Sequence, residues 1–184
     1  MVHPYLINFH QNEDKGEVFT MGNGENGQLG HGNLVNSSEF KRVEGELKER
    51  PIKKLLLGDN HTTAISQTEN QLYQWGWNGI DGNRLFPELK FERKVQKVAV
   101  GKSHTLLLVY DDSSNSQIVF SFGGNDRGQL GLLDNQNRAA PAEIQTLRNK
   151  NIAKLYATEN TSFALSGTQE TNSLASKWDD MLSS

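Results

Sequence analysis

The sequence contains no cysteine among its 184 residues. This absence excludes disulfide bonds, thiolate zinc sites, iron–sulfur clusters and a cysteine nucleophile. Proline is scarce, at 4 residues, whereas glycine is frequent, at 17.

The chain also lacks a strong excess of one charge and any long hydrophobic run. Its formal net charge is −3, from 19 basic and 22 acidic residues, so there is no general attraction to nucleic acid or an anionic membrane. The longest apolar runs, such as Leu55–Leu57 and Leu106–Tyr110, fall far short of the roughly 18 residues that span a bilayer. Residues 1–10 show no secretory signal pattern. We therefore expect a soluble intracellular protein, in the cytoplasm or nucleus and not in a membrane.

A basic stretch, Lys41–Lys54, is the one candidate for nucleic-acid binding. Glutamates interleave with its lysines and arginines, which leaves a net charge of 6 − 3 = +3. We interpret it as a solvated face and do not expect a nucleic-acid partner.

Glycine-rich motifs recur along the chain at intervals of about 50 residues, the upper end of the periods typical of repeat proteins. Gly22–Gly30 and Gly123–Gly131 each follow a short apolar segment with aromatic residues and end in Gly-Gln-Leu-Gly. Gly76–Asn83 begins in the same way but lacks Gln-Leu-Gly. We expect the glycines to adopt positive φ, the Gln and Asn side chains to hydrogen-bond the backbone of the loop, and the Leu to pack in the apolar layer between repeat units.

A second motif alternates with the first. It reads Gly-x-x-His-Thr at Gly58 and again at Gly101. A degenerate third copy has Thr158 at the position of the glycine and Thr161 at the position of the histidine. His3 precedes Gly22 by the same 19 residues that separate His104 from Gly123, so the sequence is expected to begin partway through a unit.

The segments around these motifs predict short β-strands. Lys97–Val100 and Thr105–Tyr110 are aliphatic runs bounded by turn residues, with Gly101 at the hairpin between them. Short strands at regular spacing, with a glycine motif in each unit, are typical of a radially repeated all-β fold. The linkers Val35–Ile52 and Leu133–Asn151 are expected to be loops, with a helical turn near residues 44–49.

The combination of both motifs closely resembles the regulator of chromosome condensation repeat, over about residues 3–166. The resemblance implies a seven-bladed β-propeller of four-stranded blades. Only about three and a half units are present, so we expect a partial β-propeller over residues 1–166, followed by a linker and short tail over 167–184. Its open blade edges favour self-association or cover by a partner.

Patterns that would indicate an enzyme or a cofactor lack the context they require. Gly22–Gly27 matches a dinucleotide-binding fingerprint, but turn residues follow it instead of a helix. His3, His61 and His104 occupy equivalent places in different units, so we expect them to pin turns and not to bind a metal. No nucleophile motif is present. We predict no catalytic activity, no cofactor and no metal.

The predicted function is a scaffold that presents three loops to a protein partner. The candidate contact residues in these loops are Asn23, Glu25, Asn26, Trp77, Asn78, Asp81, Asn125, Asp126 and Arg127. Trp75 is expected in the core, whereas Trp77 is either an exposed anchor or a packed loop residue.

Two other functions stay open. The resemblance implies a regulator of a small GTPase, because the founding member of the family promotes guanine-nucleotide exchange. A structural subunit of a larger assembly is the other alternative.

The tail has its own pattern. After a polar linker at residues 167–173, Leu174, Trp178, Met181 and Leu182 fall on one face of a short helix. We expect this helix to dock on the last exposed blade or to enter a partner's groove.

Overall fold

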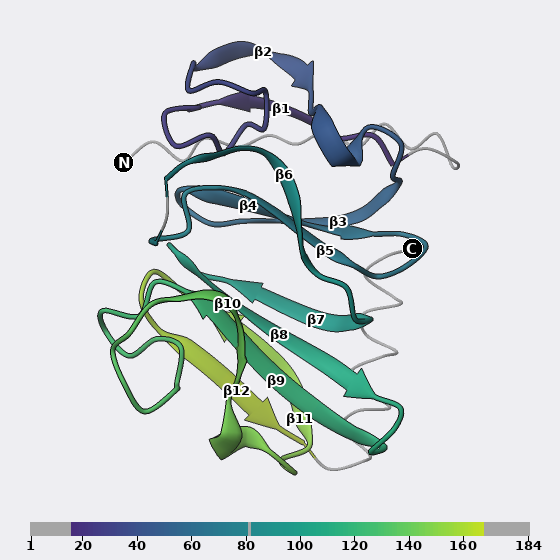
Figure 1. The fold of residues 1–184 in the computed structure, drawn as a ribbon, viewed down its shortest axis with the longest axis vertical. Helices are drawn as coiled ribbons and strands as arrows, with labels where there is room; N and C mark the ends of the chain where they lie inside the picture. The colour runs from purple at the N-terminus through teal and green to yellow at the C-terminus, as the bar shows by residue number, and fades with distance from the viewer. Residues whose placement is uncertain (1–15, 81, 168–184) are drawn as a thin grey trace.

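A computed structural model describes residues 16–80 and 82–167 of the chain. These residues form four antiparallel sheets. In Figure 1 the first sheet lies at the top, the second lies below it, and the third and fourth overlap in the lower half. The first sheet contains β1 (Phe19–Gly22) and β2 (Ser37–Arg42). The second contains β3 (Ile52–Leu57), β4 (His61–Ser66), β5 (Leu72–Gly76) and β6 (Arg84–Phe91). The third contains β7 (Val95–Val100), β8 (His104–Asp111), β9 (Ser116–Gly123) and β10 (Arg138–Glu143). The fourth contains β11 (Ile152–Ala157) and β12 (Ser162–Ser166).

The sheets share one construction, as the repeat predicts. Within each sheet every strand pairs with the next strand along the chain. The first strands of the last three sheets carry the same irregularity, located at Ile52/Lys54, Val95/Lys97 and Ile152/Lys154. The prediction of an all-β fold with strands at residues 97–100 and 105–110 is therefore confirmed.

Both long linkers contain a strand, which corrects the prediction that they are loops. Residues 35–52 include β2, and residues 133–151 include β10. The predicted helical turn is present as a 3-10 turn, η1 (Gly45–Leu47), and a second one, η2 (Gln145–Leu147), follows β10. The two missed strands lie at the edges of their sheets, with side chains that are mostly exposed or half-buried. β2 is largely polar and β10 consists mainly of alanine and proline, so neither has the apolar alternation that marks a half-buried strand.

The hydrophobic core lies between successive sheets. Val18, Val43 and Trp75 belong to the cluster between the first and second sheets. Equivalent clusters fill the second interface, around Phe122, and the third, around Ile144. Each sheet is thus stabilised mainly by its neighbours, as in other repeat folds.

The predicted tail and its helix, including Leu174, Trp178, Met181 and Leu182, lie outside the described residues. Within the described ranges, no helix has the length and apolar character needed to cross a bilayer.

Candidate interaction site at the loop edge

The loop after β9 is held in shape by its own asparagine and glutamine. Asn125 Oδ1 accepts a hydrogen bond from Leu130 N at 2.9 Å, and Gln129 Oε1 accepts one from Arg127 N at 2.9 Å. Leu130 is fully buried. Gly128 has a φ of +73°, a conformation that side-chain-bearing residues rarely adopt. The predicted roles of the glycine, the amides and the leucine are confirmed here.

The loop after β1 repeats this arrangement. Gln28 Oε1 accepts a hydrogen bond from Asn26 N at 2.9 Å, Leu29 is buried, and Gly27 has a φ of +77°. Thr20 Oγ1 anchors the loop by donating to Leu29 O at 2.6 Å, as Ser121 Oγ does to Leu130 O at 2.8 Å.

The loop after β5 is shorter and lacks the Gln-Leu-Gly segment. In the complete loops, the carbonyl of Gln28 or Gln129 accepts a hydrogen bond from a hydroxyl of the next sheet, Thr62 or Ser162. At the shortened loop the equivalent hydroxyl, that of Thr105, instead accepts a hydrogen bond from Gln74 Nε2 at 3.0 Å. The long Gln74 side chain therefore replaces a missing stretch of backbone.

The three loops form one continuous edge. Asn83 Nδ2 donates to Glu25 O at 3.3 Å and so links the first loop to the second. Asn137 Nδ2 donates to Gly79 O at 3.2 Å and links the second loop to the third. All three loops lie on the left side of Figure 1. We call residues 23–28, 77–80 and 125–129 the loop edge.

The predicted contact residues differ in their exposure. Glu25, Asp126 and Arg127 are exposed, and Asn23, Asn26 and Trp77 are half-buried. Asp81 lies outside the described residues.

Two of the predicted contact residues point inward, which corrects their expected role. Asn125 is fully buried, and its Nδ2 donates to Asp134 O at 2.9 Å and Gln136 O at 3.1 Å. Asn78 is buried as well, and its Nδ2 donates to Gln74 Oε1. These two amides satisfy buried backbone and side-chain groups, so they shape the loops and are not presented at the surface.

The two neighbouring tryptophans have different environments. Trp75 is fully buried, as predicted, and its indole Nε1 donates to Gln28 O at 2.8 Å. Trp77 is half-buried, and its backbone N donates to Asn60 O at 2.8 Å. Trp77 therefore combines a fixed backbone with a partly accessible indole at the loop edge.

The motif histidines connect one sheet to the next. His61 and His104 are both fully buried. His61 Nε2 lies 3.3 Å from Thr105 Oγ1, and His104 Nε2 lies 2.9 Å from Ser162 Oγ. The prediction that these histidines pin turns is corrected, because each ring bonds to a hydroxyl of the next sheet and so links two sheets. His3, the third member of the predicted set, lies outside the described residues.

Burial also sets the protonation of these histidines. It lowers the pKa of both His61 and His104 to about 4, because an enclosed imidazolium loses its hydration. Both rings are therefore neutral at pH 7. Within the described ranges, no three His, Asp or Glu side chains gather in a way that could hold a metal ion.

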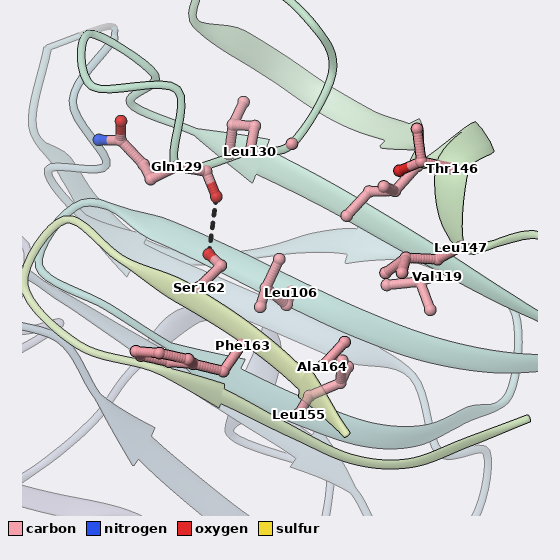
Figure 2. A pocket seen from close by; sticks show the side chains of 12 residues that line it. Leu106, Val119, Gln129, Leu130, Thr146, Leu147, Leu155, Ser162, Phe163 and Ala164 are labelled. Atoms are coloured by element: carbon pink, nitrogen blue, oxygen red, sulfur yellow. Dashed lines mark hydrogen bonds between the residues drawn. The ribbon is translucent and has the colours of Figure 1, made fainter. Parts of the chain in front are cut away.

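A cavity of about 260 Å³ lies between the third and fourth sheets. Its walls are mostly apolar, and Figure 2 shows the Gln129 carbonyl and the Ser162 hydroxyl hydrogen-bonded to each other at one side. The sequence patterns did not predict this cavity. A comparison of equivalent positions in the repeat units could have predicted it, because Trp75 occupies the corresponding space between the first two sheets.

Comparison with known proteins gives relatives for this architecture. The ultraviolet-B receptor of Arabidopsis thaliana is 30% identical over 150 residues, which cover 76% of this chain and 33% of the receptor. The regulator of chromosome condensation of Mus musculus is 29% identical over 147 residues, which cover 73% of this chain and 33% of that protein. The chain thus spans about a third of the length of these curated relatives.

Solved structures show the same fold. Prp20p from Saccharomyces cerevisiae superimposes with a TM-score of 0.67 at 19% sequence identity, over 91% of this chain and 43% of Prp20p. At this identity the likeness concerns the fold alone, and it identifies the four sheets as part of a propeller of that type.

A family model settles the family. The model of the regulator of chromosome condensation (RCC1) repeat matches residues 15–65 and 118–165, which together make up more than half of the chain. Both matched segments contain a complete Gly-Gln-Leu-Gly loop. The chain therefore belongs to the regulator of chromosome condensation repeat family.

Proposed function

We propose that this chain is a protein–protein interaction module without catalytic activity, and that it binds its partner through the loop edge. The observation that carries the proposal is the continuity of this edge. Three loops from successive sheets are joined by side-chain hydrogen bonds, and the charged side chains of Glu25, Asp126 and Arg127 project from them. A pre-organised surface of this kind binds with little loss of conformational entropy.

The chemistry of the loop edge supports binding more than catalysis. The amides of Asn125 and Gln129 are already engaged by the loop's own backbone. His61 and His104 are enclosed between sheets and bonded to hydroxyls, so they do not reach a substrate. What the edge offers a partner is charge on Glu25, Asp126 and Arg127, together with the partly accessible indole of Trp77.

The test is affinity capture with a charge-reversed loop edge. Glu25→Lys/Asp126→Lys replaces two exposed carboxylates on this edge. The matched control, Glu92→Lys/Asp112→Lys, makes the same change in charge at the opposite ends of the sheets, where both residues are exposed. We expect the loop-edge variant to lose the proteins that wild type captures and the control to keep them. Equal capture by both variants would show that binding lies elsewhere.

Regulation of a small GTPase is the second candidate. It is favoured by the similarity to the mouse regulator of chromosome condensation and by the shared fold with Prp20p, which was studied for its binding to Gsp1p and histones. Exchange factors act by binding the nucleotide-free state more tightly than the loaded state. An interaction surface is therefore sufficient for such a role, and no catalytic group is required.

Release of labelled nucleotide from a panel of small GTPases separates the two candidates. Accelerated release by wild type that is lost in Glu25→Lys/Asp126→Lys would favour exchange. Capture of a partner without acceleration on any member of the panel would favour the scaffold. A third role, as a structural subunit, would show as a partner that covers the outer sheets and tolerates the loop-edge variant.

A further inference from the structure

The geometry points to Trp178 as the occupant of the cavity between the third and fourth sheets. In this arrangement residues 174–178 add a third strand to the fourth sheet, next to β12, and the indole of Trp178 enters the cavity. This assigns the segment to a strand, whereas its residue spacing alone favours a helix.

The interface between the first and second sheets shows how such a cavity is filled. There Trp75, on the third strand of the second sheet, is fully buried. Its Nε1 donates to Gln28 O at 2.8 Å, and the Thr62 hydroxyl donates to the same carbonyl at 2.9 Å. The indole lies so close to Gly30 that a Cβ there would be 2.9 Å from Trp75 Nε1. The indole of Trp75 is therefore held in place by the complete loop, through a hydrogen bond to Gln28 O and close packing against Gly30.

The walls of the cavity repeat those surroundings residue by residue. Gln129, Gly131 and Ile144 line the cavity. The residues at the equivalent positions of the first interface are Gln28, Gly30 and Val43, in the same order. Ser162 takes the place of Thr62 and donates to Gln129 O at 2.6 Å. Among the described residues, no indole N–H bonds to this carbonyl, and a Cβ at Gly131 would meet nothing closer than Ile144 at 3.7 Å.

The middle interface explains why an indole is expected only where the loop is complete. The second sheet lacks Gln-Leu-Gly, so it offers no carbonyl at the position of Gln28. The residue that corresponds to Trp75 on the next sheet is there Phe122, which has no N–H to donate. The third sheet does have the complete loop, so a tryptophan is expected on the third strand of the fourth sheet.

Trp178 has the required position in the sequence. Trp75 lies 14 residues after His61, and Phe122 lies 18 residues after His104. Trp178 lies 17 residues after Thr161, the equivalent of those histidines, so a hairpin of intermediate length connects them. Trp75 and Trp77 both precede the third sheet, which leaves Trp178 as the tryptophan that follows it.

The register of the other sheets then predicts that of the fourth. Thr62 pairs with Trp75, and Ala64 pairs with Tyr73. By the same register Ser162 pairs with Trp178, and Ala164 pairs with Ser176. Ala164 lines the cavity, and β12 pairs only with β11 among the described strands, so its other edge can accept a third strand.

An engineered disulfide tests this register directly, because the chain has no cysteine of its own. Residues directly opposite on antiparallel strands have Cβ atoms about 4.5–5.5 Å apart, so a small backbone shift brings them within the roughly 3.5–4.5 Å of a disulfide. Ala164→Cys/Ser176→Cys is expected to form an intrachain disulfide in high yield under mild oxidation. The control, Ala164→Cys/Lys177→Cys, moves the second thiol to the opposite face of the strand, where it is expected to crosslink poorly.

Two results of this experiment would overturn the proposal. Similar intrachain yields for both pairs would mean that the segment has no fixed register against β12. Crosslinks found only between chains, as dimers on a non-reducing gel, would mean that a second copy supplies the occupant.

Thermal unfolding of the full chain tests the indole itself. Trp178→Ala is expected to lower the unfolding midpoint by on the order of 10 °C, as loss of a buried aromatic side chain does in a domain of this size. Trp178→Phe should cause a smaller drop, because it keeps the packing and removes the N–H. Lys177→Ala, the neighbouring control, should cause almost none. An unchanged midpoint in Trp178→Ala would place this side chain outside the cavity and overturn the assignment.

Discussion

At the scale of single residues, the glycine and the histidine of the Gly-x-x-His motif act as a pair. The ring of His104 packs against Gly101, where a Cβ would lie 2.1 Å from His104 Cε1 and 2.4 Å from Thr158 O. In the degenerate third copy of this motif both residues are replaced, the glycine by Thr158 and the histidine by Thr161. The turn keeps its backbone hydrogen bond, since Thr158 N donates to Thr161 O at 2.9 Å, as Gly101 N does to His104 O. The glycine is therefore required by the close approach of the ring and of the next sheet's backbone, and not by the turn.

Gly101→Ala is predicted to destabilise the chain by about 2–4 kcal/mol, because backbone and a buried ring must move to admit the methyl group. Gly82→Ala is the matched control, since nothing lies within 4 Å of a Cβ at that position. Chemical unfolding measures both. Similar free energies of unfolding for the two variants would contradict the close packing of Gly101 against His104.

The buried histidines predict a stability that falls in mild acid. Their pKa is about 4 in the folded chain and about 6.5 when unfolded, so between these values the unfolded state binds more protons. Each histidine stabilises the fold fully above pH 6.5, and this contribution falls by about 2 kcal/mol by pH 5. The hydrogen bond from the Ser114 hydroxyl lowers the pKa of Asp111, and the hydrogen bond from Gln136 N lowers the pKa of Asp134. These two carboxyl groups therefore do not contribute to the change in stability between the pKa values of the folded and unfolded histidines.

Unfolding free energies measured from pH 7 to 5 test this prediction. His104→Gln is expected to be less stable at pH 7 but to show a shallower dependence on pH, because one titrating group has been removed. An equal slope in wild type and variant would mean that His104 is not protected from protonation.

At the scale of secondary-structure elements, apolar alternation decided which strands could be predicted. β7 and β8 were predicted because their aliphatic residues face two interfaces and stand between turn residues. β2 and β10 were missed, because their side chains are mostly exposed or half-exposed and the pairing with β1 and β9 defines them. Strands of that kind have no local signature.

Strand β5 shows how one element compensates for a shortened loop. Gln74→Leu is predicted to cost about 1–3 kcal/mol, because it removes one of the two hydrogen bonds of the buried Thr105 hydroxyl and the acceptor of the Asn78 amide while keeping a similar volume. The exposed Gln145→Leu serves as the control. Denaturant titration compares them. If Gln74→Leu proved as stable as the control, the hydrogen bond to Thr105 would not be what links the second and third sheets at this point.

At the scale of the whole molecule, the fourth sheet exposes an apolar face. Tyr156, Phe163 and Leu165 are each about half exposed, at 50%, 53% and 52%. Ile65, which corresponds to Leu165 in the second sheet, is instead buried in the cluster shared with the third sheet. The outer face of the fourth sheet is thus built like an interior face, which supports the prediction that another surface covers it.

Self-association of the isolated chain follows from this face. We expect light scattering after size exclusion to show species larger than the monomer, increasing with concentration. Phe163→Thr/Leu165→Thr should weaken the association about tenfold or more, through the loss of apolar area. Leu133→Thr, at a loop position that is 89% exposed, should not. A wild-type chain that stays monomeric at all concentrations would contradict the prediction.

The repeat, the all-β class and the internal structure of the loops could all be predicted from the amino-acid sequence alone. These features depend on local chemistry: glycines at positive φ, amides that bond their own loop, and aliphatic runs between turns. Three features became visible only in the folded chain: Asn78 and Asn125 are buried, the histidines bond to the next sheet, and a cavity lies beside Gln129. The reason is physical, because each of these features lies between two sheets, and a contact between sheets is set by how they pack and not by neighbours in the chain.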